Sequence, residues 1–418
     1  MRAVAPVDEW IRFRDPRLEH VWEKVRAGER LEAADGLVCL ETQDLLALGR
    51  MADRVKQKKS GDWVYFVINR YINPTNLCVL SCSFCDFART RGEPGAFEYS
   101  ADEIVAMIDP DIREVHVVGG HHPDWPFEYY EELVRAIRRE RPLAQIKAFT
   151  AAEIDYFWRR WKIEPQEALV RLKAAGLHSM PGGGAEVFSS RLQKTLRFTG
   201  KAGADRWLEI HRIAHGLGIR SNATMLYGHV ETYAERIGHM LRLRALQDET
   251  GGFLTYIPLA YHPDHNELGE TLGRTGTATT GFDDLKNVAV GRLLLDNIPH
   301  VKTHWPMVTP FISQVALTFG CDDLEGTVVF ERVYHEAGAG TPMWLSYDQI
   351  VALVRGAGKE PVERDSLYQV VRTFEDYVPA PLAPRAAPQG PEGPTFHVEH
   401  RQSAAARRRA LPVLDGVE

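Results

Sequence analysis

Eight short apolar runs, rich in β-branched and aromatic residues, alternate with amphipathic stretches through the middle of this chain of 418 residues. The runs that we interpret as strands are residues 65–73, 115–119, 146–149, 178–180, 221–227, 253–259, 301–305 and 315–319. The stretches with helical spacing between them are residues 101–108, 129–139, 165–175, 204–215, 233–248 and 282–296. Strands that alternate with helices form parallel βα units, and eight such units close into a barrel. The pattern therefore predicts an α/β fold with a (βα)8 TIM-type barrel, and a partial barrel of six units stays open as an alternative.

The segments on either side of this pattern have a different character. Residues 1–60 are predicted to form an N-terminal helical segment, because apolar side chains such as Val21 and Val25 recur there at helical spacing. Residues 61–375 are predicted to form the barrel together with a C-terminal helical extension. Residues 376–418 are rich in Pro, Ala and Arg, with six prolines from Val378 to Pro394, and this composition predicts a flexible tail.

The overall composition is that of an ordinary globular enzyme. Charged residues make up 26% of the chain and the formal net charge is −7, so no basic stripe points to a nucleic-acid partner. There is no apolar stretch long enough to span a membrane and no cleavable signal pattern. Few cysteines, three of them clustered, indicate a reducing compartment. We therefore expect a cytoplasmic protein with neither a membrane nor a nucleic acid as partner.

Three of the five cysteines, Cys78, Cys82 and Cys85, lie within eight residues directly after the first predicted strand. The spacing i, i+4, i+7 also fits one face of a helix, so three buried core cysteines are one alternative. The turn formers Pro74 and Asn76 just before them argue against a helix at this place. The cysteine run is therefore predicted to lie on a loop.

The chemistry of the three thiols indicates which metal centre they suit. A structural zinc site needs four ligands, and the remaining cysteines, Cys39 and Cys321, are distant in the sequence. Thiolates are the preferred ligands of 4Fe–4S clusters, and three of them leave the fourth iron open to a small molecule. The spacing therefore favours an iron–sulfur cluster with one open iron over a zinc site. An electron-transfer protein with a fully ligated cluster is the alternative from a different functional class.

Polar and glycine residues follow the predicted strands, where the chemistry of a barrel collects. In chain order these residues are Gly119, Gly120, His121 and His122 after the second strand, Thr150 and Glu153 after the third, Glu186 after the fourth, Gly228 and Glu231 after the fifth, and His262 after the sixth. Because the carboxyl ends of parallel strands meet on one face, we expect these residues to surround the cysteine loop.

The cysteine run resembles the signature of the radical S-adenosylmethionine superfamily, including the aromatic Phe84 between the last two cysteines. The resemblance implies that Cys78, Cys82 and Cys85 bind a 4Fe–4S cluster whose open iron binds S-adenosylmethionine. It also implies that electron transfer from the cluster cleaves this co-substrate to methionine and a 5′-deoxyadenosyl radical.

Further motifs of this superfamily match positions after later strands. The double glycine Gly119-Gly120 corresponds to the motif that contacts the methionine amino group, although His121 stands where many members carry an acid. Glu186 is a candidate ligand for the ribose hydroxyls. The stretch that ends with Gly228 and Glu231 resembles the motif that packs against the adenine.

Longer stretches are similar to the aminofutalosine synthases of menaquinone biosynthesis, over residues 18–374. These stretches are residues 118–123, 146–151, 181–186, 221–231, 247–253, 295–300 and 361–365. The resemblance implies addition of the deoxyadenosyl radical to 3-[(1-carboxyvinyl)oxy]benzoate, an aryl enol-ether dicarboxylate. Rearrangement and decarboxylation then give 6-amino-6-deoxyfutalosine. The related cyclic dehypoxanthinyl futalosine synthases are the alternative within the superfamily.

This reaction sets demands on the remaining residues. Two substrate carboxylates need cationic or N–H donors, for which Arg89, His121, His122 and His262 are the candidates. A reactive radical needs a dry pocket, which aromatic side chains such as Tyr227 are suited to line. An external electron donor of the flavodoxin or ferredoxin type is also implied, because the cluster must be reduced.

Overall fold

The computed structural model describes residues 11–196, 201–276 and 278–379. The predicted tail, residues 376–418, therefore lies outside the described residues except for its first four positions. Within the described part of the chain, no helix combines the length and apolar character that a membrane span requires.

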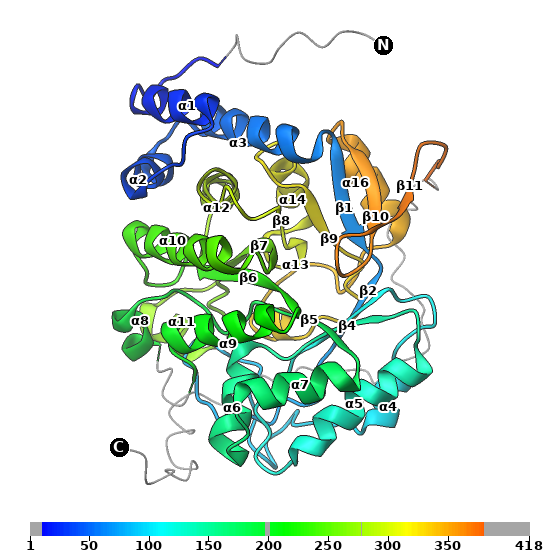
Figure 1. The fold of residues 1–418 in the computed structure, drawn as a ribbon. Helices are drawn as coiled ribbons and strands as arrows, with labels where there is room; N and C mark the ends of the chain where they lie inside the picture. Colours follow the sequence, from blue (N-terminus) through cyan, green and yellow to red (C-terminus); the bar gives the residue numbers. More distant parts are fainter. Residues whose placement is uncertain (1–10, 197–200, 277, 380–418) are drawn as a thin grey trace.

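Seven parallel strands form the main sheet of the molecule (Figure 1). Each strand is hydrogen-bonded to the next strand in chain order, as expected of consecutive βα units. These strands are β2 (Asn69–Ile72), β3 (Glu114–Val117), β4 (Gln145–Ala148), β5 (Leu177–Met180), β6 (Arg220–Tyr227), β7 (Phe253–Ala260) and β8 (His300–Val301). The architecture is a partial TIM barrel, which confirms the predicted fold class in its partial form.

A second sheet occupies the open side of this partial barrel. Its order is β11 (Val370–Thr373), β10 (Glu360–Arg364), β1 (Trp63–Val67) and β9 (Asp323–Gly326), and β1 runs almost directly into β2. The Asp322 backbone N–H donates to the Val301 carbonyl at 3.0 Å, and the Thr303 N–H donates to the Asp323 carbonyl at 2.9 Å. Strand β9 thus lies between β8 of the main sheet and β1 of the second sheet.

Helices connect the strands and cover the outside of the sheet (Figure 1). The connecting helices are α4 (Ala101–Ala106), α5 (Phe127–Glu140), α6 (Ala151–Trp161), α7 (Pro165–Ala175), α8 (Ser190–Thr195), α9 (Ala204–Gly216), α10 (Tyr233–Thr250), α11 (Glu267–Leu272), α12 (Gly281–Leu294), α13 (Trp305–Val308), α14 (Pro310–Ala316), α15 (Val333–Glu336) and α16 (Tyr347–Gly356). Several begin with reciprocal side-chain caps, for example Ser100 with Glu103 and Thr232 with Glu235. The local sequence therefore determines where these connecting helices begin.

Three helices precede the first strand, in the segment that was predicted to be helical. They are α1 (Arg17–Ala27), α2 (Ala33–Glu41) and α3 (Leu45–Ser60), drawn in blue in Figure 1. Helix α3 packs against α12, and α2 packs against α10 and α12. This segment therefore covers the outer helices of the barrel.

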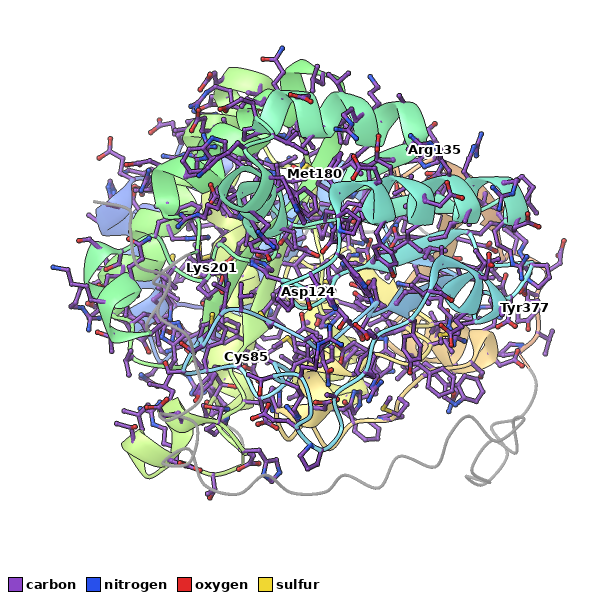
Figure 2. The ribbon with its side chains drawn as sticks, turned by 90° about the horizontal axis from the view of Figure 1, so that it is seen from below. Cys85, Asp124, Arg135, Met180, Lys201 and Tyr377 are labelled. Carbon is purple, nitrogen blue, oxygen red and sulfur yellow. The ribbon has the colours of Figure 1, made fainter. Side chains whose placement is uncertain are left out.

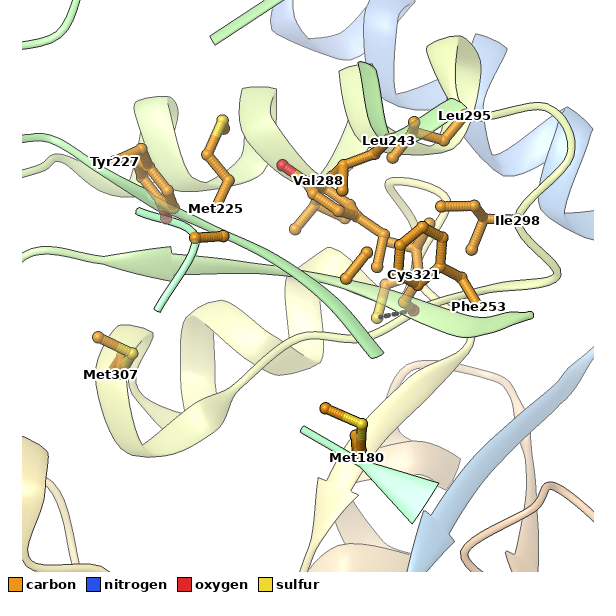
Figure 3. Close-up of a cluster of buried hydrophobic side chains, with 14 of the residues drawn as sticks. Met180, Met225, Tyr227, Leu243, Phe253, Val288, Leu295, Ile298, Met307 and Cys321 are labelled. Carbon is orange, nitrogen blue, oxygen red and sulfur yellow. Dashed lines mark hydrogen bonds between the residues drawn. The ribbon is translucent and has the colours of Figure 1, made fainter. Parts of the chain in front are cut away.

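The core lies between the sheet and its covering helices. Figure 3 shows part of it, with Met225 and Phe253 from the sheet against Leu243 and Val288 from α10 and α12. Cys321 belongs to this cluster and donates its thiol hydrogen to the Val301 carbonyl, with the sulfur 3.2 Å from that oxygen. Burial of these side chains supplies the main driving force for folding.

The predicted eighth strand, residues 315–319, is wrong. Helix α14 ends at Ala316, and the strand that follows is β9. Thr309 caps α14 and Pro310 takes its first position, two start signals that favour a helix. Strand β9 carries the buried carboxylates of Asp323 and Glu325, so it lacks the apolar pattern by which strands are recognised.

Candidate active site

The cysteine loop follows β2 at the carboxyl end of the sheet, as predicted. Its backbone is held on two sides: the Cys78 N–H donates to the Arg89 carbonyl and the Val79 N–H to the His121 carbonyl, both at 3.0 Å. Cys78, Cys82 and Cys85 are partly exposed, whereas Cys39 and Cys321 are buried elsewhere in the core. The three clustered thiols are thus the cysteines presented on this loop, and Cys85 is labelled in Figure 2.

Desolvation strongly affects the clustered thiols. Burial raises the pKa of Cys78 to about 11 and that of Cys82 to about 12, and it raises the pKa of Cys85 as well. The ammonium group of Lys201 acts in the opposite direction on all three. A bound metal centre replaces the thiol protons, so thiols in these poorly solvated surroundings suit metal ligation better than free thiolate chemistry.

The arrangement of the thiols can be compared with what different metal centres need. Among the described residues, no three His, Cys, Asp or Glu side chains form a ready site for a metal ion. A 4Fe–4S cluster attaches each thiolate to a different iron, so it needs thiols spread around its corners rather than gathered at one point. Three thiols on a pinned loop beside one buried cation fit such a cluster.

Gly119 and Gly120 lie where the chain after β3 passes the cysteine loop. A side chain on Gly120 would place its Cβ 2.2 Å from the Leu77 carbonyl oxygen, and one on Gly119 would lie 3.0 Å from the Thr75 oxygen. The Gly120 N–H donates to the Thr75 carbonyl at 2.8 Å. Close backbone packing against the loop therefore accounts for both glycines, independently of any ligand.

The two predicted histidines next to them have different surroundings. His122 uses both ring nitrogens: Nε2 lies 2.7 Å from a Glu98 oxygen, and Nδ1 accepts the Trp125 N–H at 2.9 Å. His121 stacks on Tyr156, burial lowers its pKa to about 3, and its buried Nδ1 has no partner among the described residues. Only His121 therefore has a ring nitrogen left for a ligand.

Glu186 forms a buried ion pair that sequence reasoning missed. Its partner is Lys201, whose ammonium group also lies 5.4 Å from the centre of the Phe84 ring. Glu186 has a φ of 40°, an uncommon conformation for a residue other than glycine. Lys201 lies shortly before α9 with no motif around it, so nothing in the sequence singled it out.

The predicted pair after β6 forms a closed network. Glu231 accepts the Gly228 N–H at 2.6 Å and pairs with Arg236 at 2.7 Å. Burial acts to raise the pKa of Glu231, but His229 and Arg236 lower it to about 2. Gly228 has a φ of 92°, a conformation that favours glycine. The network fixes the turn that begins α10.

Arg89 and His262 also have partners of their own. The Arg89 guanidinium donates to the Asp86 carbonyl and pairs with Glu336 of α15 at 3.3 Å, while its Nε has no partner among the described residues. The His262 ring contacts the Met307 carbonyl through Nε2 at 3.0 Å. Arg89 thus braces the cysteine loop, and His262 is attached to α13.

Glu153, placed after β4, contacts the same region. It forms a capping box with Thr150, and its Oε1 accepts the Gly119 N–H at 3.4 Å. Burial raises the pKa of Glu153 to about 7, against the effect of these hydrogen bonds. The carboxylate therefore ties the start of α6 to the double glycine.

The inner wall of the barrel carries charges that the sequence analysis did not identify. Lys147 contacts Glu114 at 2.5 Å, Lys302 contacts Glu325 at 3.0 Å, and Arg364 contacts Asp323 at 2.7 Å, and all six side chains are buried. In β3 and β4, polar residues alternate with apolar ones, so Glu114 and Lys147 lie on the face opposite the apolar side chains. This alternation of polar and apolar residues was the sequence signal from which the buried charges could have been predicted.

Comparison with known proteins agrees with this geometry. Residues 72–243 match the Radical SAM superfamily, and residues 250–377 match the CofH/MqnC C-terminal region. The chain is 49% identical over 367 residues to the aminodeoxyfutalosine synthase of Thermus thermophilus, covering 87% of this chain and 98% of that protein. It is 41% identical over 368 residues to the aminodeoxyfutalosine synthase of Streptomyces coelicolor, covering 86% of this chain and 95% of that protein.

A solved structure shares the architecture. The crystal structure of methylornithine synthase superposes with a TM-score of 0.64 at 17% identity, covering 82% of this chain and 97% of that one. At this identity the likeness supports the fold alone.

Proposed function

The chain belongs to the aminodeoxyfutalosine synthase family of radical SAM enzymes, and on this premise we propose its reaction. The 5′-deoxyadenosyl unit of S-adenosylmethionine is joined to the enol-ether double bond of 3-[(1-carboxyvinyl)oxy]benzoate. Rearrangement onto the aryl ring and loss of a carboxyl group give 6-amino-6-deoxyfutalosine, an intermediate of menaquinone biosynthesis. The observation that supports this proposal most strongly is 49% identity across 98% of the Thermus thermophilus enzyme.

The cysteine loop would hold the cluster. Cys78, Cys82 and Cys85 would each bind one iron, and Lys201 would offset part of the negative charge that three thiolates bring into a buried site. When bound, the cluster supplies the electron that cleaves S-adenosylmethionine, and an external donor of the flavodoxin or ferredoxin type replenishes it. Arg89 holds the loop in place through the Asp86 carbonyl.

Residues around the loop would position the co-substrate. Phe84 and the backbone of Gly119 and Gly120 line its approach, and the Glu186 carboxylate would accept ribose hydroxyl groups. The network of Gly228 and Glu231 would position the co-substrate indirectly, by fixing the turn after β6. Among the candidates for substrate carboxylates, His121 has a free ring nitrogen next to this region, whereas His122 and His262 would hold their loops in place.

This assignment gives each part of the chain a role. Residues 61–375 would form the catalytic barrel and its extension. Residues 1–60 would support the barrel from outside, because α3 of this segment packs against α12 of the barrel.

Identification of the product tests the proposed reaction. The protein is reconstituted with iron and sulfide without oxygen, then supplied with S-adenosylmethionine, a reductant and 3-[(1-carboxyvinyl)oxy]benzoate. Mass spectrometry is expected to find one product that contains both the adenosine unit and the aryl ring. Free 5′-deoxyadenosine as the sole nucleoside product would instead favour hydrogen abstraction, as expected of a cyclic dehypoxanthinyl futalosine synthase.

A further inference from the structure

Two histidines on the inner wall of the barrel carry a buried ring nitrogen without a partner among the described residues. They are His304, which is the third residue after the end of β8 and is 3% exposed, and His116 of β3. The free atoms are Nε2 of His304 and Nδ1 of His116. A buried imidazole nitrogen that lacks a hydrogen bond costs free energy, so each marks a position where a ligand would supply the missing partner.

The two rings belong to one aromatic surface. The centre of the His116 ring lies 4.3 Å from that of Tyr71, and the Tyr71 ring lies 6.2 Å from His304. Tyr334 of α15 approaches the His304 ring edge-on, with the ring centres 5.1 Å apart. Flat aromatic faces on neighbouring strands suit a ligand that is itself aromatic.

Charged groups lie directly beneath this surface. Glu325 contacts His304 Nδ1 at 3.3 Å and accepts hydrogen bonds from Tyr71 and Asn69, both at 3.2 Å. Because Nδ1 of His304 faces Glu325, Nε2 is the ring atom that remains for a ligand. The ammonium groups of Lys302 and Lys147 are part of the same buried group and supply positive charge beneath the rings.

Part of this surface is open to solvent. His116, Leu226, Leu259 and Tyr334 are partly exposed, whereas the charged side chains below them are buried. The cysteine loop begins beyond Ile72, the last residue of β2, one position after Tyr71. A ligand held on these rings would therefore extend toward the cysteine loop.

We propose that His304 and His116 bind the aryl carboxylate of the substrate, with Tyr71 and Tyr334 against its ring. This assignment rests on the proposed function, which supplies a benzoate as the acceptor. The carboxylate accepts N–H groups from the two imidazoles, with His304 as the imidazolium, because its Nδ1–H is donated to Glu325 and its Nε2–H to the ligand. The enol ether points toward the cysteine loop, where the adenosyl unit is released. His304 lies near the end of the predicted strand 301–305, whereas His116 lies inside the predicted strand 115–119, where no motif marks it.

Two unreactive probes test the assignment by equilibrium binding. The first is 3-(1-carboxyethoxy)benzoate, in which the double bond is saturated, and the second is 2-phenoxypropanoate, which lacks the aryl carboxylate. Wild-type protein with its cluster is expected to bind the first probe about 30-fold more tightly than the second, as for a buried charge pair. The variant His304→Asn keeps an amide near the Nδ1 position but has no group at Nε2, so it should bind both probes about equally.

The matched control is His211→Asn. His211 is also fully buried and also has a free Nε2, but its Nδ1 contacts Ser221 at 2.8 Å on the helix side of β6. This variant should bind both probes as wild type does. Equal preference for the benzoate probe in His304→Asn and wild type would overturn the assignment.

A second variant keeps the test decisive if His304→Asn does not fold. His116→Gln removes Nδ1 and leaves an amide near Nε2, and it should lose the preference for the benzoate probe as well. An unchanged preference in folded His116→Gln would contradict the assignment. Failure of the proposed function has a different signature, because wild-type protein would then form no adenosine-containing aryl product.

Discussion

Burial and position separate the five cysteines into two groups. Cys78, Cys82 and Cys85 lie partly exposed on one loop. In contrast, Cys39 is buried in α2, and the buried Cys321 sulfur lies 3.2 Å from both the Val301 and the Asp323 carbonyl oxygens. The spacing of the first three was visible in the sequence because neighbouring ligands on one loop need no tertiary information. The structure adds the ammonium group of Lys201, whose charge acts on all three thiols.

Replacing Cys82 by Ala should abolish cluster binding while the fold is retained. The iron and sulfide content of the reconstituted protein is expected to drop to background, and its circular dichroism spectrum should match wild type. The control Cys321→Ala changes a buried thiol of the core and should keep the full iron content, at a cost of about 1 kcal/mol in unfolding free energy. Loss of the cluster in Cys321→Ala would show that the ligand set is wrong.

Lys201 is the residue whose importance only the folded chain reveals. Lys201→Met leaves the Glu186 carboxylate buried without its cation, which should lower the unfolding free energy by about 3 kcal/mol. Removal of the positive charge near the thiols should also speed the loss of iron to a chelator. Lys201→Arg keeps the charge and should stay closer to wild type in both measurements; equal effects of Met and Arg would contradict the electrostatic role.

At the scale of elements, backbone contact sets the position of the cysteine loop. The turn after β3 packs so closely on residues 75–77 that glycine is required. Gly120→Ala would bring a methyl group against the Leu77 carbonyl, so the loop should shift and iron binding should fall several-fold. Iron content and thermal unfolding of the variant measure this. Gly238→Ala in α10 has open space around it and should be neutral or stabilise by about 0.5–1 kcal/mol.

Most strands and helices could be predicted because their apolar residues follow a regular period. Helix α7 matches its predicted bounds, Pro165–Ala175, since Pro165 and Gly176 mark its ends. Strand β9 could not be found in the same way, because Asp323 and Glu325 are neutralised by Arg364 and Lys302 from distant parts of the chain. Such pairing depends on the tertiary fold and leaves no local pattern.

At the scale of the whole molecule, the buried charges make stability depend on pH. Burial alone would raise the pKa of Glu114, but Lys147 and Arg364 lower it to about 2. The pKa of Asp322 is also held below its usual range, because Arg292 and His300 outweigh its burial. A carboxylate with a lowered pKa stabilises the folded state above its ordinary pKa, and this contribution is lost as the pH falls toward the lowered value.

The free energy of unfolding should therefore fall steeply between about pH 4.5 and pH 2. At neutral pH, Glu114→Gln should cost about 3–5 kcal/mol, because it leaves Lys147 buried without a full partner. Denaturant titrations at several pH values measure both effects. Glu249→Gln breaks an exposed pair with Arg212, which solvent screens, and should change the free energy of unfolding far less. Equal costs for the two variants would argue against the buried network as a source of stability.

The central claim is that three thiols at the carboxyl end of this partial barrel leave one iron open to S-adenosylmethionine. Electron–nuclear double resonance of the reduced, reconstituted protein tests it directly, with S-adenosylmethionine labelled by 15N at the amino group and 13C at the carboxylate. We predict hyperfine coupling from both labels, which places the two groups on a single distinct iron. A cluster that shows no coupling to either label, because a fourth protein ligand occupies that iron, would contradict the account.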